Sequence, residues 1–413
     1  MGSKLREDAA RVIENTLKEI NPYKAVQETL KEFSDKAYVF AIGKAAWVMA
    51  EAANETLGER ALGGVVITKY GHSMGDIDGL RIFEAGHPLP DKNSVAASEY
   101  ALNFFSGLSE NDNIIFLISG GGSALFEYPE NGVDLNDIEE LSKKLLYSGA
   151  DIKQINTVRK RLSKVKGGKF AKICEPAKIY SIILSDVLGD DPGFIASGPA
   201  YADSSAADAA VKIIRKYDIK ISENLLSFLK KELPCEINNV ETSIIGSVRQ
   251  LCQSVAKSLE YLGYNAYVLT EDMTNEAREA GRLIGSIAAK NSIAPAFKTP
   301  CALIFGGETV VKVTGNGKGG RNQEIALAAA SRISGLSNVC IFSLGSDGTD
   351  GPTDAAGGIV DGNSYQKYLD LGLSPDEYLN DNNAYELLKT SGDLLVTGPT
   401  GTNVNDVTVV MIH

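Results

Sequence analysis

The chain has 413 residues, of which 44% are hydrophobic and 23% charged, and its formal net charge is -12 at pH 7. This length exceeds what one ordinary core accommodates and predicts two domains. The acidic balance argues against a general nucleic-acid binder, and no apolar run approaches the roughly 18 residues that cross a bilayer. The N-terminal segment is polar and helical in pattern, unlike a signal peptide, so we expect a cytoplasmic protein with no membrane partner.

Residue types that dominate metal and nucleophile chemistry are scarce. The five cysteines are scattered and never form a C-x-x-C pair, which predicts reduced, buried thiols rather than disulfides or a thiolate zinc site. Only three histidines occur, His72, His87 and His413. Their scarcity argues against most histidine-centred mechanisms and most zinc enzymes.

Short β-forming runs alternate with helical patterns through the first half of the chain. The β-forming runs are 38–42, 65–68, 114–119 and 179–185, and the helical patterns are 93–105, 134–147, 151–165 and 206–216. Such alternation predicts α/β layers around a parallel sheet. We therefore expect a nucleotide- or phosphate-binding domain over 1–237, with a three-layer α/β/α Rossmann-like fold and a mostly parallel sheet. Ligands of such sheets bind outside the carboxyl ends of the strands.

A proline and several turn residues at 232–242 mark the predicted domain boundary. The C-terminal α/β domain, over 238–413, is expected to begin with a strand at 242–248. The run ALIFGGETVVKV at 302–313 has two glycines between β-formers and predicts a hairpin, so we expect a mixed sheet. The predicted active site lies in the cleft between the two domains.

Three consecutive glycines follow the run at 114–119. Gly120, Gly121 and Gly122 leave backbone N–H groups free to surround a phosphate, and Ser123 adds a hydroxyl donor. A serine nucleophile is disfavoured, because Leu125 stands where the G-x-S-x-G elbow requires glycine. A tight turn that lets a helix approach the strand is the structural alternative.

Lys44 follows the first β-forming run, at the start of a helix. The helix dipole disfavours a cation at this end, so the placement indicates a functional lysine. In a parallel sheet Lys44 would lie beside the glycine triplet. A solvated surface lysine is the alternative.

Acidic residues follow the run at 179–185. Asp186, Asp190 and Asp191, with Gly189 among them, come directly after a buried strand. Carboxylates at a strand end are suited to hold Mg²⁺ against triphosphate oxygens, and Asp186 is the first candidate, with Asp190 beside it. Helix caps and turn formers are the alternative role for these aspartates.

The stretch GNGKGGRNQE at 315–324 fits the pattern G-x-G-x-x-G. A dinucleotide site needs a buried parallel strand before this pattern and an acid at the tip of the next strand. Neither is predicted here, so we interpret the match as accidental. Lys318, Arg321 and Asn322 are instead expected to reach an anionic ligand from a basic loop.

A second glycine-rich loop, at 345–358, carries Asp347, Asp350 and Asp354. The spacing is similar to that of a calcium loop, but no glutamate closes an EF-hand at position 12. We expect Asp347 and Asp350 to contact the substrate through a hydroxyl or a metal.

Seven motifs in order carry a family resemblance. They are AIGKAAWVMA, HPLPD, SGGGSALF, SDVLGDDPGFIASGP, GGETVVKV, GKGGRNQE and SDGTDGPTDAAGG. From about Ala37 to its C-terminus, the chain resembles the two-domain glycerate 2-kinases whose C-terminal part is called the MOFRL domain. The resemblance implies ATP- and Mg²⁺-dependent phosphorylation of D-glycerate at its 2-hydroxyl. It also implies functional roles for Lys44 in the G-K-A motif and Arg321 in G-G-R-N-Q-E.

Other roles follow from the chemistry of phosphoryl transfer, which requires positioned oxygens and neutralised charge. Asp186 or Asp191 would orient or deprotonate the glycerate hydroxyl. Arg159 or Arg161 would bind the substrate carboxylate, although their basic run is also typical of a solvated helix face.

Lys44 and Arg321 belong to different halves of the chain, so we expect domain closure to bring both to one phosphoryl group. Two other functions stay open. An NAD(P)-dependent hydroxypyruvate reductase would need a nicotinamide site, which the sequence does not supply convincingly. A non-catalytic nucleotide- or sugar-acid-binding regulator would gain nothing from carboxylates facing phosphate.

Overall fold

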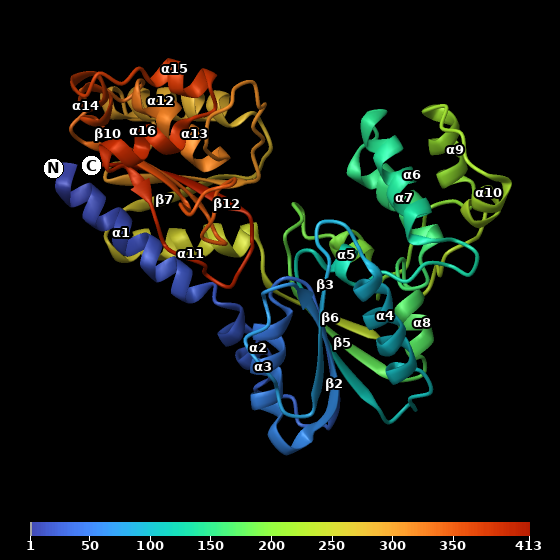
Figure 1. Cartoon of the computed structure of the whole chain (residues 1–413). Helices are drawn as coiled ribbons and strands as arrows, with labels where there is room; N and C mark the ends of the chain where they lie inside the picture. Colours follow the sequence, from blue (N-terminus) through green and yellow to red (C-terminus); the bar gives the residue numbers. More distant parts are fainter. Residues whose placement is uncertain (1) are drawn as a thin grey trace. The chain divides into compact units, whose positions relative to one another are not determined.

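The computed structural model describes residues 2–413, which divide into two compact units (Figure 1). One unit is Pro22–Ile245, and the other is Gly246–His413 together with the N-terminal segment that ends at Asn21. This division differs from the predicted ranges, 1–237 and 238–413, in the N-terminal helix and in the strand at 240–246. No helix in the described residues is long and apolar enough to cross a membrane.

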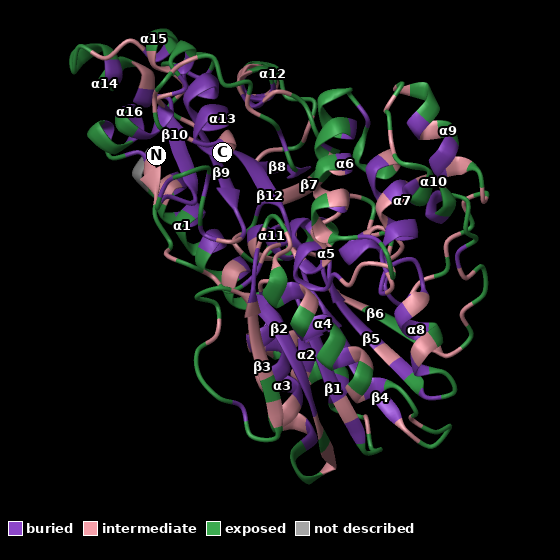
Figure 2. Ribbon diagram, turned by 45° about the vertical axis from the view of Figure 1, so that its right-hand side comes forward, coloured by how far each residue is buried: buried purple, intermediate pink, exposed green. Residues whose placement is uncertain are grey.

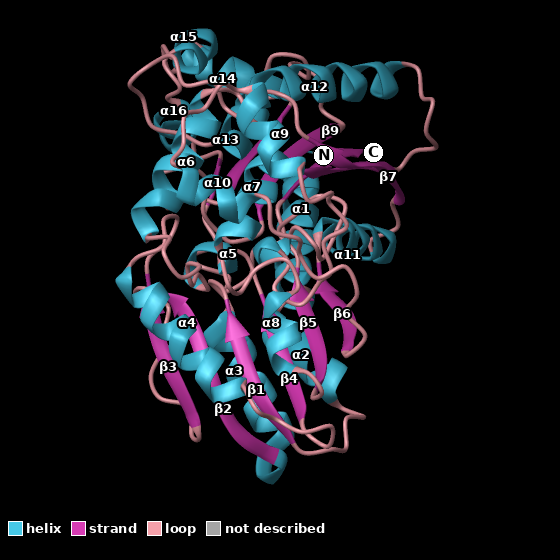
Figure 3. Ribbon diagram, turned by 90° about the vertical axis from the view of Figure 1, so that its right-hand side faces the viewer, coloured by secondary structure: helices cyan, strands magenta, loops and turns pink. Residues whose placement is uncertain are grey.

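The unit Pro22–Ile245 is built on a six-stranded sheet in the order β3-β2-β1-β4-β5-β6. Its strands are β1 (Ala37–Ile42), β2 (Ala61–Lys69), β3 (Leu80–Ala85), β4 (Asn113–Ile118), β5 (Lys178–Leu184) and β6 (Val240–Gly246). The first five strands pair in parallel, and Figure 3 shows them side by side. The strand order is that of Rossmann-type sheets, as predicted. β6, expected in the second domain, is instead the edge strand of this sheet.

Helices cover both faces of this sheet. α4 (Lys92–Phe105), α5 (Gly122–Leu125) and α8 (Lys169–Cys174) pack on the face that carries Phe40 and Phe116. These two rings stack with centroids 4.8 Å apart, and Phe170 lies 5.0 Å from each. α3 (Ala46–Leu57) packs against the sheet, with α2 (Pro22–Leu30) against α3. Since side chains alternate between the faces of a strand, this arrangement produces the three layers predicted.

Four helices of the first unit form a separate cluster rather than a layer on the sheet (Figure 1). They are α6 (Leu135–Tyr147), α7 (Ile152–Leu162), α9 (Ala209–Lys216) and α10 (Glu223–Leu229). Their apolar sides share a core of their own, which includes Leu141, Val158, Ile214 and Phe228. The periodicity predicted helices in these regions, apart from α10, but it does not say against which surface a helix packs.

The second unit is built on a mixed six-stranded sheet in the order β11-β10-β9-β12-β8-β7. Its strands are β7 (Asn265–Met273), β8 (Cys301–Gly307), β9 (Val339–Gly345), β10 (Gly357–Asp361), β11 (Leu394–Leu395) and β12 (Asp406–Ile412). β12 lies between β8 and β9 and pairs antiparallel with both, whereas β7 and β8 are parallel. Figure 2 shows β9 and β12 as buried, in keeping with their central positions.

The predicted hairpin at 302–313 is wrong. Only β8 forms there, and the chain after Gly307 continues as a loop with one isolated bridge from Val310 to Glu276. The loop is held from another direction, because the Asn382 side chain accepts hydrogen bonds from the N–H groups of Thr314 (2.7 Å) and Gly315 (2.9 Å). The antiparallel partner of β8 is β12, so the sheet is mixed for a different reason.

Helices also cover both faces of the second sheet. They are α1 (Gly2–Glu19), α11 (Val248–Tyr261), α12 (Ala277–Ile293), α13 (Arg321–Ala330), α14 (Ser364–Asp370), α15 (Pro375–Asn380) and α16 (Ala384–Ser391). Figure 1 shows α1 beside α11, with α12, α13 and α16 on the opposite face. α1 is bound to this unit by Arg6, which pairs with Asp361 (2.5 Å) and Asp393 (2.9 Å). These ion pairs explain why the first helix does not belong to the domain that follows it in sequence.

Candidate active site

β1 and β4 are neighbours at the centre of the first sheet. From β1 the chain continues to β2 on one side, and from β4 it continues to β5 on the other side, so the carboxyl ends of β1 and β4 form the topological switch point. Gly43 and Lys44 follow β1, and Gly120–Gly122 follow β4. The two loops are joined by hydrogen bonds from Lys44 N–H to the Gly120 carbonyl (2.9 Å) and from Ala45 N–H to the Ser119 hydroxyl (3.1 Å). Two of the predicted motifs therefore meet where this type of sheet binds ligands.

The glycine triplet has a backbone that only glycine accommodates. Gly121 has φ +87°, in the left-handed region, and a Cβ atom on Gly120 would lie 2.3 Å from a carboxylate oxygen of Asp186. Within the described residues, the N–H groups of Gly121 and Ser123 have no hydrogen-bond acceptor. These two donors are free to bind an anion, which a purely structural turn does not require.

Lys44 lies directly against this triplet. Its Cγ is 3.3 Å from the position that a Cβ atom of Gly121 would occupy. The side chain is half-buried, and no carboxylate in the described part of the chain pairs with it. A cation without a counter-ion beside free N–H donors is suited to hold a phosphate.

The three aspartates of the loop after β5 have different environments. Asp186 lies against Gly120, as described above, and is half-buried. Asp190 adopts φ +53° and buries one carboxylate oxygen. Asp191 is exposed and accepts the N–H of Gly193 at 2.9 Å, as a turn former does, and Gly189, with φ +85°, is exposed. Asp186 is therefore the acid of this loop that the structure brings to the glycine triplet.

Ser123 forms hydrogen bonds through both its hydroxyl and its backbone carbonyl. Its hydroxyl lies 2.8 Å from the Ser197 hydroxyl, and its carbonyl accepts hydrogen bonds from Lys166 Nζ (2.6 Å) and Arg159 (3.3 Å). The guanidinium of Arg159, 16% exposed, also lies 3.6 Å from Glu127. Arg159 therefore reaches the end of the glycine loop.

Arg161 has a different environment, although it is two residues away on the same helix. It is fully buried, and its guanidinium donates to the Thr157 carbonyl (2.9 Å), the Ser205 hydroxyl (3.0 Å) and the Ala206 carbonyl (2.8 Å). Burial with these partners gives Arg161 a structural role, so its guanidinium is not available to the substrate carboxylate in this structure.

Lys166 and Glu127 were not among the predicted site residues. Both are completely buried, and Lys166 Nζ lies 3.3 Å from the Glu127 carboxylate. Burial lowers the pKa of Lys166 to about 8, although Glu127 acts in the opposite direction. Because Lys166 also binds the carbonyls of Ser123 and Phe126, it positions the backbone that follows the glycine triplet. The basic run that contains Lys166 was visible in the sequence, but its burial was not.

In the second unit, Arg321 is the first residue of α13. Its guanidinium forms two hydrogen bonds with Asp406, at 2.5 and 3.0 Å, and a third with Glu308 at 2.9 Å. Burial lowers the pKa of Arg321, but Asp406 and then Glu308 outweigh this effect, so the net pKa lies above its ordinary value. Arg321 is thus a firmly charged group that already has two acidic partners.

The remaining second-unit candidates differ in exposure. Asp350 is 3% exposed and caps α13 by accepting the N–H groups of Asn322 (3.2 Å) and Gln323 (2.9 Å). The Asn322 side chain is also buried and accepts the Ser343 hydroxyl at 2.6 Å. Asp350 and Asn322 are therefore both buried and bound to other residues of this unit. Asp347 is half-buried in its loop, and Lys318 is exposed, with Nζ 4.3 Å from the centroid of the Tyr385 ring.

Two family descriptions match the chain. Residues 8–230 match the domain of unknown function DUF4147, and residues 301–406 match the MOFRL family. A D-glycerate 2-kinase of Thermotoga maritima is 49% identical over 99% of this chain and 98% of its own length. A glycerate 2-kinase of Pyrococcus horikoshii is 42% identical over 99% of this chain and 97% of its own length. The chain belongs to this two-domain glycerate 2-kinase family.

A crystal structure of the Thermotoga maritima glycerate kinase superposes with a TM-score of 0.97 over 100% of both chains, at 49% identity.

The glycines at 315–320 have a packing role, which agrees with the prediction that they do not form a dinucleotide-binding motif. A Cβ atom on Gly315 would lie 2.3 Å from the Cα of Asp381, and one on Gly317 equally close to Asn383 Cβ. These glycines let the loop pack on a neighbouring turn, and no strand precedes them directly.

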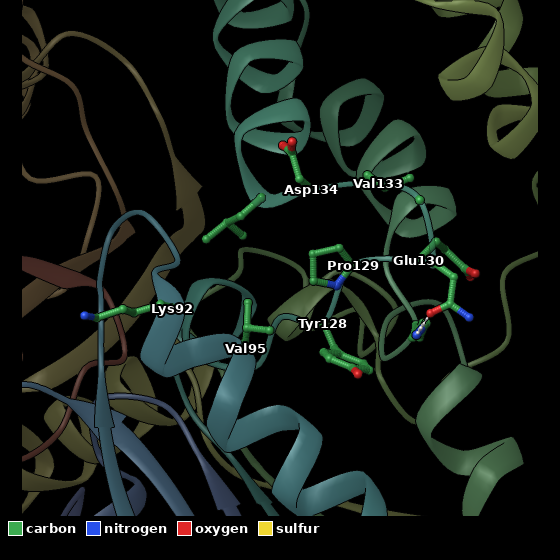
Figure 4. A pocket seen from close by; sticks show the side chains of 11 residues that line it. Lys92, Val95, Tyr128, Pro129, Glu130, Val133 and Asp134 are labelled. Atoms are coloured by element: carbon green, nitrogen blue, oxygen red, sulfur yellow. Dashed lines mark hydrogen bonds between the residues drawn. The ribbon is translucent and has the colours of Figure 1, made fainter.

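A pocket of the first unit lies between α4 and the segment that follows α5 (Figure 4). Its volume is about 470 Å³, and it is lined by Lys92 and Val95 of α4 together with residues 128–135 and Lys164. None of the predicted site residues lines it. The switch point, where the unpaired charged groups and N–H donors of the described residues lie, is therefore the candidate active site.

Proposed function

We propose that this protein transfers the γ-phosphoryl group of ATP to the 2-hydroxyl of D-glycerate and releases 2-phosphoglycerate and ADP. The observation that carries the proposal is the assembly of Lys44, the free N–H donors of Gly121 and Ser123, and Asp186 at one sheet edge. Relatives named as glycerate 2-kinases over nearly the whole chain support it.

The residues present fit a nucleotide phosphate. The N–H groups of Gly121 and Ser123 would hold phosphate oxygens, and Lys44 would neutralise charge that develops on the transferred group. Such transfer depends on positioning and charge stabilisation rather than on covalent chemistry by the protein. The groups needed are those that this loop leaves without protein partners.

Asp186 would hold Mg²⁺ near the phosphates, with Asp190 as a second candidate. No group of three or more His, Cys, Asp or Glu side chains in the described residues is arranged to hold a metal. Mg²⁺ usually keeps several waters and binds through one or two carboxylates and the substrate phosphates, so Asp186 and Asp190 would be enough protein ligands. When bound, the ion would neutralise phosphate charge. Asp186 also remains the candidate that orients the glycerate hydroxyl, because Asp191 serves its own turn.

Arg159 is the proposed partner of the glycerate carboxylate. It lies at the end of the glycine loop, and one of its N–H groups, on Nε, is buried without a partner in the described residues. A guanidinium is suited to bind a carboxylate through two parallel hydrogen bonds. The role of Arg321 at the same phosphoryl group, and the domain closure it requires, stay predictions.

The decisive experiment measures ADP release with D-glycerate in a coupled assay and identifies the product by phosphorus NMR. The proposal requires glycerate-dependent turnover and 2-phosphoglycerate. Product analysis is needed because the Thermotoga maritima crystal structure carries the number EC 2.7.1.31, whereas the proposed 2-kinase is EC 2.7.1.165. NADH oxidation with hydroxypyruvate would favour the reductase instead, and ATP binding without turnover would favour a regulator.

A further inference from the structure

Four basic residues lie at or just after the carboxyl ends of β1, β2 and β3, and the charges of Lys44, Lys69 and His72 all act on His87. They are Lys44 after β1, Lys69 at the end of β2, His72 in the following turn and His87 after β3. His87 Nε2 lies 3.1 Å, and Lys44 Cγ 3.3 Å, from the position that a Cβ atom of Gly121 would occupy. His72 donates from Nδ1 to the Lys44 carbonyl at 3.1 Å. Lys69, His72 and His87 were not among the predicted site residues, although His87 is the first residue of the HPLPD motif.

The positive charges of this cluster are not balanced by ion pairs. Among the described residues, neither Lys44 nor Lys69 lies within ion-pair distance of a carboxylate. The nearby acids are held elsewhere: Glu84 accepts the N–H groups of Gly71 (2.9 Å) and Ser73 (3.1 Å). Asp91 caps α4, and Asp186 lies against Gly120 rather than Gly121. A space with unpaired cations and the free Gly121 N–H group is suited to an anion.

The electrostatics of His87 agree with this geometry. Burial, then the charges of Lys44, Lys69 and His72, lower the pKa of His87 to about 4. The imidazole is therefore neutral at pH 7 and acts as one donor and one acceptor. An anion placed among these groups would offset the repulsion and raise the pKa of His87 again.

We propose that Lys44, Lys69, His72 and His87 form a binding site for one oxyanion of the reaction's ligands, either a phosphate group of ATP or the carboxylate of D-glycerate. The proposal rests on the proposed kinase function for the identity of the ligands. It adds Lys69, His72 and His87 to the switch-point site. Gly121 is needed because any side chain there would fill the space between His87 and Lys44.

Histidine NMR tests this directly, because the chain has only three histidines, His72, His87 and His413. The protein is labelled with ¹³C at histidine Cε1, and the signals are assigned with the variants His72→Gln and His87→Gln. The pKa of each imidazole is then measured at constant ionic strength in four samples: no ligand, inorganic phosphate, ADP and D-glycerate. His413 belongs to the other unit and serves as the internal control.

We expect the pKa of His87 to rise by about one unit or more in at least one sample, while that of His413 stays constant. A rise with phosphate and ADP identifies the nucleotide phosphate as the ligand, and a rise with D-glycerate alone identifies the carboxylate. An unchanged His87 pKa in every sample would overturn the proposal, as would a shift that His413 shares.

Two lysine variants give a second readout in the kinase assay. Lys69→Met is expected to raise KM about tenfold for the ligand that shifts His87, because a charge-assisted contact is lost. Lys178→Met removes the same charge from an exposed position at the amino end of β5 and should change KM less than about twofold. Equal effects in the two variants would contradict the site. If the wild type phosphorylates no glycerate, the proposed function fails, but the phosphate titration still tests the oxyanion site.

Discussion

The two units use similar residue types in opposite ways. In the first unit, Lys44 and the N–H groups of Gly121 and Ser123 lie at the carboxyl ends of the strands, and no partner for them occurs among residues 2–413. In the second, Arg321 is already bound by Asp406 and Glu308. The difference shows that a charged residue in a glycine-rich loop is available to a ligand only where the fold leaves it unpaired.

Lys44→Met gives the largest expected effect on activity. Because no carboxylate in the described residues pairs with Lys44, its removal should lower kcat about 10²- to 10³-fold while the thermal midpoint stays close to that of the wild type. Steady-state kinetics and thermal unfolding measure the two quantities. Near-wild-type turnover would remove Lys44 from the active site, and Lys178→Met controls for the change in net charge.

Arg321→Met should alter stability as well as activity, in contrast to Lys44→Met. It leaves the Asp406 carboxylate, 5% exposed, without its partner, which costs about 3 kcal/mol of unfolding free energy. Denaturant unfolding measures this cost. The double variant Arg321→Met with Asp406→Asn should recover part of the stability but none of the activity, if Arg321 also serves the phosphoryl group. Recovery of both would assign Arg321 a structural role alone.

The pair Arg159 and Arg161 repeats the comparison within one helix. Arg159→Met should raise the KM for D-glycerate about tenfold or more, because the proposed carboxylate contact is lost. Arg161→Met should leave KM unchanged and lower the unfolding free energy by about 2 kcal/mol, since it leaves buried carbonyls without donors. Steady-state kinetics and denaturant unfolding, measured on both variants, distinguish the two roles. A raised KM in Arg161→Met and an unchanged KM in Arg159→Met would contradict the proposed site.

His87 gives the smallest expected effect, and it depends on pH. Its pKa in the folded protein, about 4, lies below the unfolded value near 6.5, so the unfolded state binds more protons between these values. Its contribution to stability is therefore present above pH 6.5 and is lost as the pH falls towards 4. Between pH 7 and pH 5 the wild type should lose about 1 kcal/mol more stability than His87→Gln, after allowance for partial solvent screening. Parallel pH profiles of the two proteins would show that His87 titrates normally.

Local patterns predicted much of this fold. Each β-forming run of the first half became a strand of the parallel sheet, and the motifs at Lys44, the glycine triplet and Asp186 were found together at one sheet edge. Parallel pairing makes this outcome predictable, since all carboxyl ends of such strands lie on the same side. The hairpin at 302–313 was wrong because β-propensity does not reveal that β12, about a hundred residues later, is the pairing partner of β8.

The sequence by itself determined the layered α/β architecture, the family and the loops that carry charge, because periodicity and motif spacing are local properties. Only the tertiary structure decided which charges are free. It paired Arg321 with Asp406, buried Arg161 and Asp350, and brought His87 to Gly121. Burial and charge pairing depend on residues far apart in the chain, and it is these long-range contacts that make a charged side chain either part of the framework or available to a ligand.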